Sequence, residues 1–269
     1  EYNIQDVELV DKLEDKMKLI ELCLTMAYEA KVNYTDVYSQ VRCWDTIIYN
    51  HLLKKNIIIP PREDHDKDTQ YEGAYVKDPQ LGLHNWIVSF DLNSLYPHLI
   101  MQYNLSPETL VGVQPKNMGV ENYLNEKFNL QWAKDKNVTV APNGSMYRRD
   151  KQGFLPELME KMYGDRVVFK KKTIEAKKEF QKTKDPIYKN EISRCNNIQM
   201  AKKIALNSAY GAIGNQYFRY FDVRIAEAIT LGGQLSIRWV ERDVNKFMNK
   251  LLNTDNVNYV VASETDSIY

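Results

Sequence analysis

The sequence predicts an α+β protein that combines a small antiparallel sheet with long helices, two of which form an antiparallel hairpin. Three observations predict this fold class. Apolar residues recur every three or four positions over several long stretches, which is typical of amphipathic helices. Short apolar runs at 71–79, 85–91 and 258–269 indicate strands. Asp185 and Pro186 separate two helical stretches, so the chain is expected to turn back there.

Composition narrows the classes of protein. With 269 residues, 43% of them hydrophobic and 27% charged, the chain has room for one large globular domain or for two to three smaller ones. No apolar run reaches the length of a membrane span, so no membrane partner is expected. The 36 basic and 36 acidic residues cancel, which argues neither for nor against nucleic acid. Three dispersed cysteines and four histidines lack zinc-ligand spacing, so carboxylates would hold any metal, and magnesium is favoured.

Two helices and a linker are expected before the first strand. A periodic apolar stripe predicts a helix over 7–30, and a second helix is expected over 43–54. Residues 57–70, with a proline pair and a charged run, are the best linker candidate. The stripe of the first helix consists of Val7, Val10, Leu13, Met17, Ile20 and Leu24.

The runs 71–79 and 85–91 are predicted to be neighbouring strands of one sheet. Ile87, Val88 and Phe90 indicate a buried strand that ends at Asp91. Tyr96 and Pro97 follow within a sharp turn, before a new apolar run.

The expected helical hairpin has arms at 155–182 and 187–212. Between 148 and 184 there are twelve Lys or Arg against six Asp or Glu, so the first arm is basic. A further helix is expected over 222–252. Its predicted core face consists of Ile225, Ile229, Leu235, Trp239, Val240, Val244 and Phe247.

Acidic residues stand at two strand ends. Asp91 closes one strand, and the run 258–269 predicts a hairpin with a strand at Tyr259–Ala262 and with Glu264 and Asp266 at its tip. If the strands are neighbours, the carboxylates of Asp91 and Asp266 converge, and crowded carboxylates need a cation. Two divalent ions about 4 Å apart would neutralise them and clamp an in-line phosphoryl displacement. The alternative is that these are ordinary turn-forming aspartates.

Three motifs resemble those of family B DNA polymerases. SFDLNSLYP at 89–97 is similar to the first palm motif, KKIALNSAYG at 202–211 to the fingers motif, and SETDS at 263–267 to the second palm motif. They occur in the family's order with a basic helical hairpin between the palm motifs. The flanking segments YEGAYVKDP and YFRYFDVRIAEAIT resemble those of replicative polymerases of T-even-like phages. The resemblance implies a palm with an antiparallel sheet and an α-helical fingers hairpin.

By this resemblance the acids would bind two Mg²⁺ ions. Asp91 and Asp266 would be catalytic ligands, and the carbonyl of Leu92 would be a further ligand. Glu264 replaces the family's usual Asp, so its carboxylate would lie about one C–C bond, roughly 1.5 Å, out of place. The backbone of the turn through Ser94 and Leu95 would bind the triphosphate in an anion nest. Tyr96 would lie under the sugar and exclude a 2′-hydroxyl, or else be a core tyrosine.

The fingers motif predicts a polar stripe on one helix face. Lys203, Asn207, Tyr210 and Gly211 follow i, i+4, i+7 and i+8 spacing. From spacing alone such a stripe is a solvated face. The resemblance instead places Lys203 at the triphosphate as a catalytic residue, Asn207 in the nucleotide pocket, and Tyr210 and Gly211 against the nascent base pair.

Arg166 and Lys170 are an i, i+4 pair on the opposing basic helix. The resemblance implies that they grip the β- and γ-phosphates, and the alternative is charge for solubility. At the start, Tyr2 and Asp6 resemble the last exonuclease motif, Y-x-x-x-D, in which Asp6 would bind a metal. The other exonuclease acids would lie before Glu1, so that site is expected to be incomplete.

The resemblance implies a template-directed DNA polymerase that transfers dNMP to a primer 3′-hydroxyl, in a chain cut at both ends. The alternative is a split or remnant polymerase piece that binds nucleic acid or a partner. Expected partners are primer–template DNA, dNTP, complementary polymerase fragments and a sliding clamp, in the cytoplasm of a phage-infected bacterium. The implied parts are the end of a 3′–5′ exonuclease domain (1–18), a helical connector (19–70), the first part of the palm (71–152), the fingers (153–214) and the truncated second part of the palm (215–269).

Overall fold

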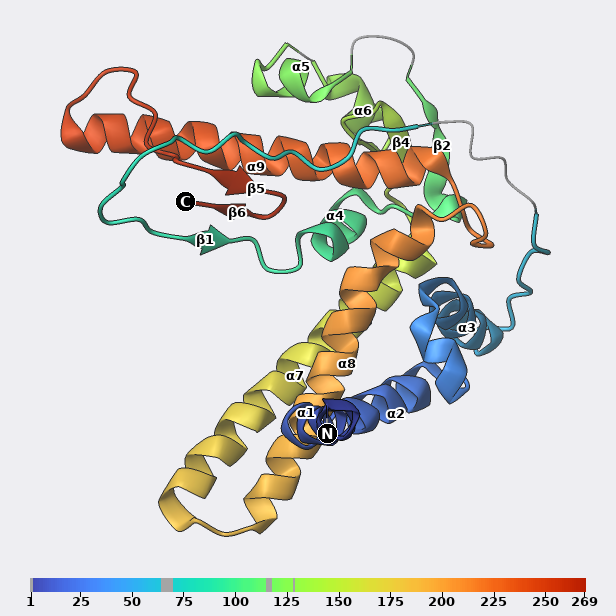
Figure 1. Ribbon diagram of the computed structural model, residues 1–269. Coiled ribbons are helices and arrows are strands. Elements are labelled where there is room, and N and C mark those ends of the chain that lie inside the picture. The colour runs from blue at the N-terminus through green and yellow to red at the C-terminus, as the bar shows by residue number, and fades with distance from the viewer. Residues whose placement is uncertain (1, 64–69, 115–117, 128) are drawn as a thin grey trace. The chain divides into compact units, whose positions relative to one another are not determined.

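The computed structural model describes residues 2–63, 70–114, 118–127 and 129–269 (Figure 1). The chain forms two compact units. The first comprises Glu1–Glu63 with Glu160–Arg219, and the second comprises Asp64–Met159 with Tyr220–Tyr269. The helices of the first unit are α1 (Tyr2–Met17), α2 (Leu19–Ala30), the 3₁₀ turn η1 (Tyr34–Tyr38), α3 (Gln40–Leu53), most of α7 (Phe154–Thr183) and α8 (Ile187–Ile213).

The helix predicted over 7–30 is two helices. Lys18 adopts a left-handed conformation with φ 53° and ends α1, and α2 starts at the next residue. The apolar stripe from Val7 to Leu24 that predicted the helix is more than half exposed throughout. Helix α2 instead contacts α8, and its buried side chains are Ala27 and Ala30. Small side chains allow the two helix backbones to approach closely. Alanines contribute little to the hydrophobic periodicity of the sequence, so this buried face was not predicted.

Helix α3 packs on α8 through a buried tryptophan. Trp44 is 1% exposed, and its Nε1 donates to the carbonyl of Ala205 at 3.1 Å and to Ser208 Oγ at 3.2 Å. The Ser39 hydroxyl caps the start of α3 by accepting from the backbone N–H of Arg42. The linker predicted over 57–70 has no regular structure at 57–63, and 64–69 lie outside the described residues.

The predicted helical hairpin is present. Helices α7 and α8 run antiparallel and are joined by a short turn at Lys184–Pro186 (Figure 1). Their bounds agree with the predicted arms at 155–182 and 187–212 within about one residue.

The second unit holds two small sheets and the long helix α9 (Val223–Leu252). One sheet has the order β1-β6-β5, made of Phe90–Asp91, Ser267–Ile268 and Ser263–Glu264. The other has the order β2-β4-β3, made of Leu110–Val113, Ser145–Arg148 and Val138–Val140. Shorter helices complete the unit: α4 (Leu95–Tyr103), η2 (Pro107–Thr109), α5 (Val120–Leu124) and α6 (Gln131–Asp135).

The two segments predicted to be neighbouring strands lie on opposite sides of the terminal hairpin. β1 pairs with β6, whereas Lys77 forms an isolated bridge with Ser263 of β5. The prediction of adjacency was therefore wrong, because the terminal hairpin separates the two segments. The prediction of a buried strand was also wrong, since Ile87, Val88 and Phe90 are 51–61% exposed. β1 forms only two residue pairs, both with β6, and these apolar side chains are not covered by the described residues.

The terminal hairpin forms close to where it was expected. Its first strand is Ser263–Glu264 rather than Tyr259–Ala262, because the regular pairing is confined to the residues next to the turn. Irregular pairing continues through Val261, whose N–H donates to the carbonyl of Tyr269 at 2.8 Å. Ile268 and Val260 of this hairpin pack with Ile237 of α9 in one apolar cluster.

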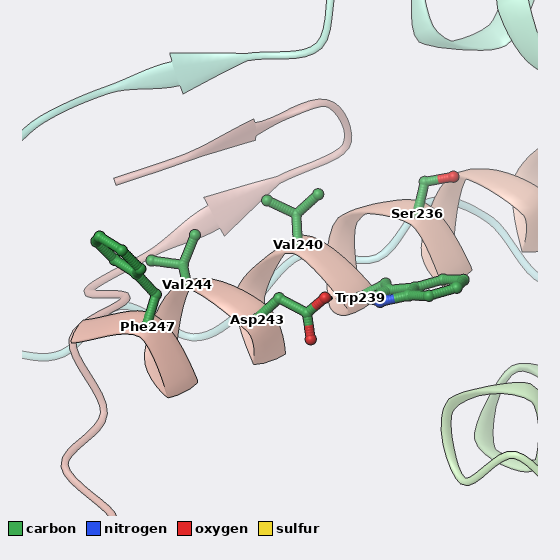
Figure 2. Close-up of a pocket in the computed structure, with 6 residues that line it drawn as sticks. All are labelled: Ser236, Trp239, Val240, Asp243, Val244 and Phe247. Atoms are coloured by element: carbon green, nitrogen blue, oxygen red, sulfur yellow. Dashed lines mark hydrogen bonds between the residues drawn. The ribbon is translucent and has the colours of Figure 1, made fainter. Parts of the chain in front are cut away.

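Helix α9 covers this hairpin and has both buried and open apolar surface. Ile225, Ile229 and Leu235 are buried as predicted, but Trp239 and Phe247 are 52% and 62% exposed. These two residues line an open pocket of about 490 Å³ on α9 (Figure 2). Asp243 also lines it and accepts a 2.8 Å hydrogen bond from Trp239 Nε1. In the described residues, no helix is long and apolar enough to cross a membrane.

Candidate active site

The structure brings Asp91 and Asp266 to one point of the β1–β6 pair. Asp91 lies opposite Ser267, the residue after Asp266. The N–H of Leu92 donates to the backbone carbonyl of Asp266 at 2.7 Å, which extends the pairing by one residue. The two acids predicted to converge therefore lie close together, Asp91 at the end of β1 and Asp266 in the turn that leads into β6.

The charge of Asp91 acts on the carboxyl group of Asp266. Burial of the Asp266 side chain raises its pKa above the ordinary aspartate value, and the negative charge of Asp91 raises it further. Glu264 contributes the smallest of the raising effects, and its side chain is exposed on β5. Repulsion between close carboxylates disfavours their joint ionisation, so a cation bound between Asp91 and Asp266 would stabilise the charged pair.

The donors at this point fit magnesium better than zinc. Asp91 and Asp266 offer carboxylate oxygens, and the backbone carbonyl of Leu92 directly follows Asp91 in the chain. Across the described parts of the chain, no three His, Cys, Asp or Glu side chains gather as a metal-binding group. Mg²⁺ is commonly held by one or two carboxylates together with waters and substrate phosphates, so two acids are a sufficient protein contribution.

The start of α4 lies directly after this acidic point. Ser94 has φ 53° and ψ 49°, so the chain reverses through a left-handed residue before Leu95 begins the helix. The side chain of Ser94 forms no capping hydrogen bond with the first turn of this helix. The first N–H groups of a helix lack intrahelical acceptors and carry a partial positive charge. This end of α4 therefore has the polarity that an anion requires.

Tyr96 is half-buried on the first turn of α4. Burial raises the pKa of its phenol, and the charge of nearby Asp266 raises it further. Leu99 and Ile100, later in the same helix, are 2% and 0% exposed and anchor it in the core. The structure therefore brings Tyr96 to the same site as Asp266.

The polar stripe of α8 belongs to the first unit and is described separately. Lys203, Asn207 and Gly211 are exposed, and Tyr210 is half-buried. Lys203 and Asn207 line a pocket of about 420 Å³, together with Gln40, Met200, Ile204 and Ser208. Polar and apolar side chains converge there on the side where α8 meets the start of α3.

The opposing helix α7 presents Arg166 half-buried and Lys170 exposed. Next to Arg166, Asp165 accepts a 3.1 Å bond from Lys202, which also donates to Glu29 at 2.7 Å. Burial lowers the pKa of Lys202, but the two carboxylates outweigh it, so the pKa is raised overall. This ion-pair group joins α7, α8 and α2.

Tyr2 and Asp6 lie one turn apart on α1, and both are exposed. The described residues add no further acids to Asp6 that would complete a metal-binding group. The exonuclease role of Asp6 stays a prediction.

Comparison with known proteins decides the family. The family model of DNA polymerase family B matches residues 32–269. The chain belongs to DNA polymerase family B. Its polymerase relatives include the DNA-directed DNA polymerases of Enterobacteria phage T4 and Escherichia phage RB69, 33% and 32% identical over alignments that cover 100% of this chain and 34% of each relative. The chain thus spans about a third of the length of these family B relatives.

A eukaryotic relative and a solved structure extend the likeness. The DNA polymerase delta catalytic subunit of Candida albicans is 26% identical over 99% of this chain and 24% of the relative. The structure of the family B DNA polymerase from Pyrobaculum calidifontis matches with a TM-score of 0.65 at 24% identity, covering 95% of this chain and 29% of that one. This structural match supports the family B fold.

Sequence reasoning missed two contacts of the family B motifs. A Cβ on Gly211 would lie 2.3 Å from Gln40 Oε1, and a Cβ on Gly233 would lie 3.0 Å from Tyr96 Cε1. Gln40 carried no signal in the sequence, because its place beside the fingers motif comes from tertiary packing. Gly233 did carry a signal. A glycine in a helix interior lowers helix stability relative to alanine, and close packing against another element is a common reason for its presence.

Proposed function

We propose that this chain carries the nucleotidyl-transfer site of a template-directed DNA polymerase that adds dNMP to a primer 3′-hydroxyl. The pairing of β1 with β6, which brings Asp91 beside Asp266, is the observation that supports it most strongly. Membership of DNA polymerase family B, established over residues 32–269, supports the same reaction class. Because the relatives are about three times longer, this activity is proposed for the complete protein.

Asp91, Asp266 and the carbonyl of Leu92 would hold two Mg²⁺ ions. When bound, such ions neutralise phosphate charge and help to ionise the attacking hydroxyl. The protein's own contribution would be to hold the two carboxylates in place before substrate arrives, one at the end of β1 and one in the turn before β6, which avoids reorganisation during the reaction. Glu264, exposed on β5, would be an outer participant whose longer side chain reaches the ions less directly.

The turn through Ser94 and Leu95 would receive the triphosphate. The N–H groups at the start of α4, where the Ser94 side chain forms no capping hydrogen bond, favour an anion there. Tyr96, the next residue, would lie under the sugar and exclude a 2′-hydroxyl. A deoxynucleotide would then be selected by shape before any chemical step.

The α7–α8 hairpin would serve as fingers. Lys203 and Asn207, which line one pocket of α8, would contact the triphosphate and the nucleotide, and Lys203 would protonate or neutralise the leaving pyrophosphate. Tyr210 and Gly211 would pack against the nascent base pair. Arg166 and Lys170 would grip the β- and γ-phosphates when the hairpin closes on a matched nucleotide.

We further propose that the chain divides into the end of an exonuclease domain (1–18), a connector (19–70), a palm (71–152 and 215–269) and fingers (153–214).

The proposed exonuclease residue, binding partners and cellular setting rest on the same family resemblance. Asp6 would be one metal ligand of a proofreading exonuclease whose other acids lie elsewhere in the complete protein. Primer–template DNA and dNTP are the proposed partners, with a sliding clamp or complementary polymerase fragments as further ones. The proposed setting is the cytoplasm of a phage-infected bacterium.

Primer extension tests the proposal. The complete protein is incubated with a primer–template, dNTPs and Mg²⁺, and extension of the primer is followed on a denaturing gel. Asp91→Ala should abolish extension, whereas Asp243→Ala, an exposed acid of α9, serves as the matched control and should leave it intact. Wild-type extension that persists in Asp91→Ala contradicts the proposal. Binding of primer–template without extension by wild type would instead favour a remnant that only binds nucleic acid.

A further inference from the structure

Two consecutive glycines lie inside the long helix α9. Gly232 and Gly233 are both buried, and they occupy the interior of a 30-residue helix. Glycine in a helix interior costs about 1 kcal/mol relative to alanine. Such a cost needs a packing reason, and at Gly233 the Tyr96 side chain of α4 supplies one.

Each glycine lies beneath a different part of α4. A Cβ on Gly232 would lie 3.4 Å from Tyr103 Cε2 and 3.5 Å from Leu99, which are ordinary contacts. A Cβ on Gly233 would lie 3.0 Å from Tyr96 Cε1, closer than side-chain carbons normally approach. The ring of Tyr96 therefore uses the space that Gly233 leaves open, whereas Tyr103 and Leu99 leave room for a methyl group.

The helix around Gly233 is held in place from another side. Thr230 Oγ1 donates to the carbonyl of Glu72 at 2.7 Å, and Gln234 Nε2 donates to the carbonyl of Gly73 at 2.8 Å. Helix α4 is anchored by Leu99 and Ile100, which are almost fully buried. Because both backbones are fixed, an added methyl group at position 233 would displace the end of the Tyr96 ring by a few tenths of an ångström.

We propose that Gly233 is the positioning residue that sets the Tyr96 ring, and thereby the selectivity of the site between deoxyribonucleotides and ribonucleotides. This inference rests on the proposed function, in which Tyr96 lies under the incoming sugar. Gly233 itself would touch no substrate. It acts by leaving space in which the Tyr96 ring packs against α9 in one position, so that the distance from ring to sugar is fixed before a nucleotide binds.

Steady-state incorporation by the complete protein measures the effect. For wild type, Gly233→Ala and Gly232→Ala, kcat and KM are determined for a dNTP and for the matching rNTP. We expect Gly233→Ala to raise the KM for dNTP and to change the dNTP-to-rNTP ratio of kcat/KM by about fivefold or more, since small displacements at a reacting site have large effects. Gly232→Ala, one residue away, should stay within about twofold of wild type because its methyl group meets only ordinary contacts.

A second comparison separates positioning from general damage. In a Tyr96→Ala background the ring is gone, so adding Gly233→Ala should leave the selectivity ratio unchanged, as coupling between contacting residues requires. Thermal melting follows folding of each variant. If Gly233→Ala alone is unfolded at the assay temperature, Tyr96→Ala with Gly233→Ala must regain the fold, and failure to do so overturns the inference.

The outcomes distinguish this inference from the proposed function. A wild-type protein that incorporates no dNMP refutes the proposed function and the inference with it. A wild-type protein that incorporates normally, but whose selectivity ratio is unchanged by Gly233→Ala or equally changed by Gly232→Ala, refutes the inference alone. An altered ratio in Gly233→Ala that disappears in the Tyr96→Ala background supports it.

Discussion

The backbone N–H of Leu92 donates a 2.7 Å hydrogen bond to the carbonyl of Asp266. This bond joins the end of β1 to the turn of the terminal hairpin, and it places Asp91 beside Asp266 although they are far apart in the chain. Burial raises the pKa of Asp266, and the charge of nearby Asp91 raises it further. The two negative charges therefore repel each other, and a bound cation would offset this repulsion.

The first prediction concerns this titration. In metal-free protein, Asp91→Asn should lower the pKa of Asp266 toward the ordinary aspartate value, because the second-largest raising cause is removed. Carboxyl-carbon NMR against pH measures it, and Asp243→Asn is the control that should change nothing. A pKa of Asp266 that is the same in wild type and Asp91→Asn would show that the two carboxylates do not interact.

The same raised pKa predicts a sign for stability. A carboxyl group that binds its proton more tightly in the folded state makes the free energy of unfolding fall as pH rises from its unfolded pKa through its raised folded pKa. Asp266→Asn removes the titrating carboxyl group and with it this decrease in the free energy of unfolding. In chelator, the variant should gain stability relative to wild type as pH rises through that window, measured by urea denaturation at several pH values. A constant difference across the window contradicts the prediction.

Magnesium should stabilise the wild-type protein in a saturable way. At free Mg²⁺ about ten times its dissociation constant, binding to the folded state alone adds about 1.4 kcal/mol to the free energy of unfolding. Asp91→Asn and Asp266→Asn should each lose this gain, whereas Asp243→Asn should keep it. Thermal melting with and without Mg²⁺ is the measurement. An equal gain in all four proteins would place the cation elsewhere.

Trp44 should be essential to the contact between α3 and α8. Trp44→Ala removes a side chain that is 1% exposed and is expected to cost about 3–5 kcal/mol. Trp44→Phe keeps most of the apolar volume but loses the bonds to Ala205 and Ser208, at about 1–3 kcal/mol. Hydrogen exchange of α8 amides reports the local stability. Faster exchange in Trp44→Ala than in Trp44→Phe is expected, and wild-type exchange in both contradicts the packing described.

Lys202 should stabilise the first unit in a pH-dependent way. Lys202→Met leaves Glu29 and Asp165 without their shared cation, and the expected cost is about 2 kcal/mol at neutral pH. Because the folded pKa of Lys202 is raised, this contribution is complete below the ordinary lysine pKa and disappears as pH rises through the raised value. The gap in unfolding free energy between wild type and variant should therefore close at high pH. A gap that stays constant would assign the loss to packing alone.

Periodicity predicted the long helices well. α7, α8 and α9 begin and end within about one residue of the expected bounds, since their amphipathic patterns run over several turns and their ends carry turn signals. It failed at Lys18, where a left-handed residue divides one expected helix into two. Lysine does not signal such a conformation, and the apolar stripe continued across the break.

The acidic pair was predictable because strand ends and hairpin tips can be recognised in sequence. The order of the segments was not, since pairing of 71–79 with β5 and of β1 with β6 depends on contacts between distant parts of the chain. Gly233 beneath Tyr96 and Gln40 beside Gly211 were hidden for the same reason. The roles of Lys203, Asn207, Arg166 and Lys170 remain predictions from the family motifs.

The most direct test compares single-turnover dNMP incorporation by the complete wild-type protein, Asp91→Asn, Asp266→Asn and the double variant. If the two carboxylates act as one cation site, each single variant loses at least about a thousandfold in rate and the double variant loses no more, because residues that act as a unit are not additive. Either single variant that keeps the wild-type rate, or a double variant whose loss equals the product of the two single losses, would contradict a shared site.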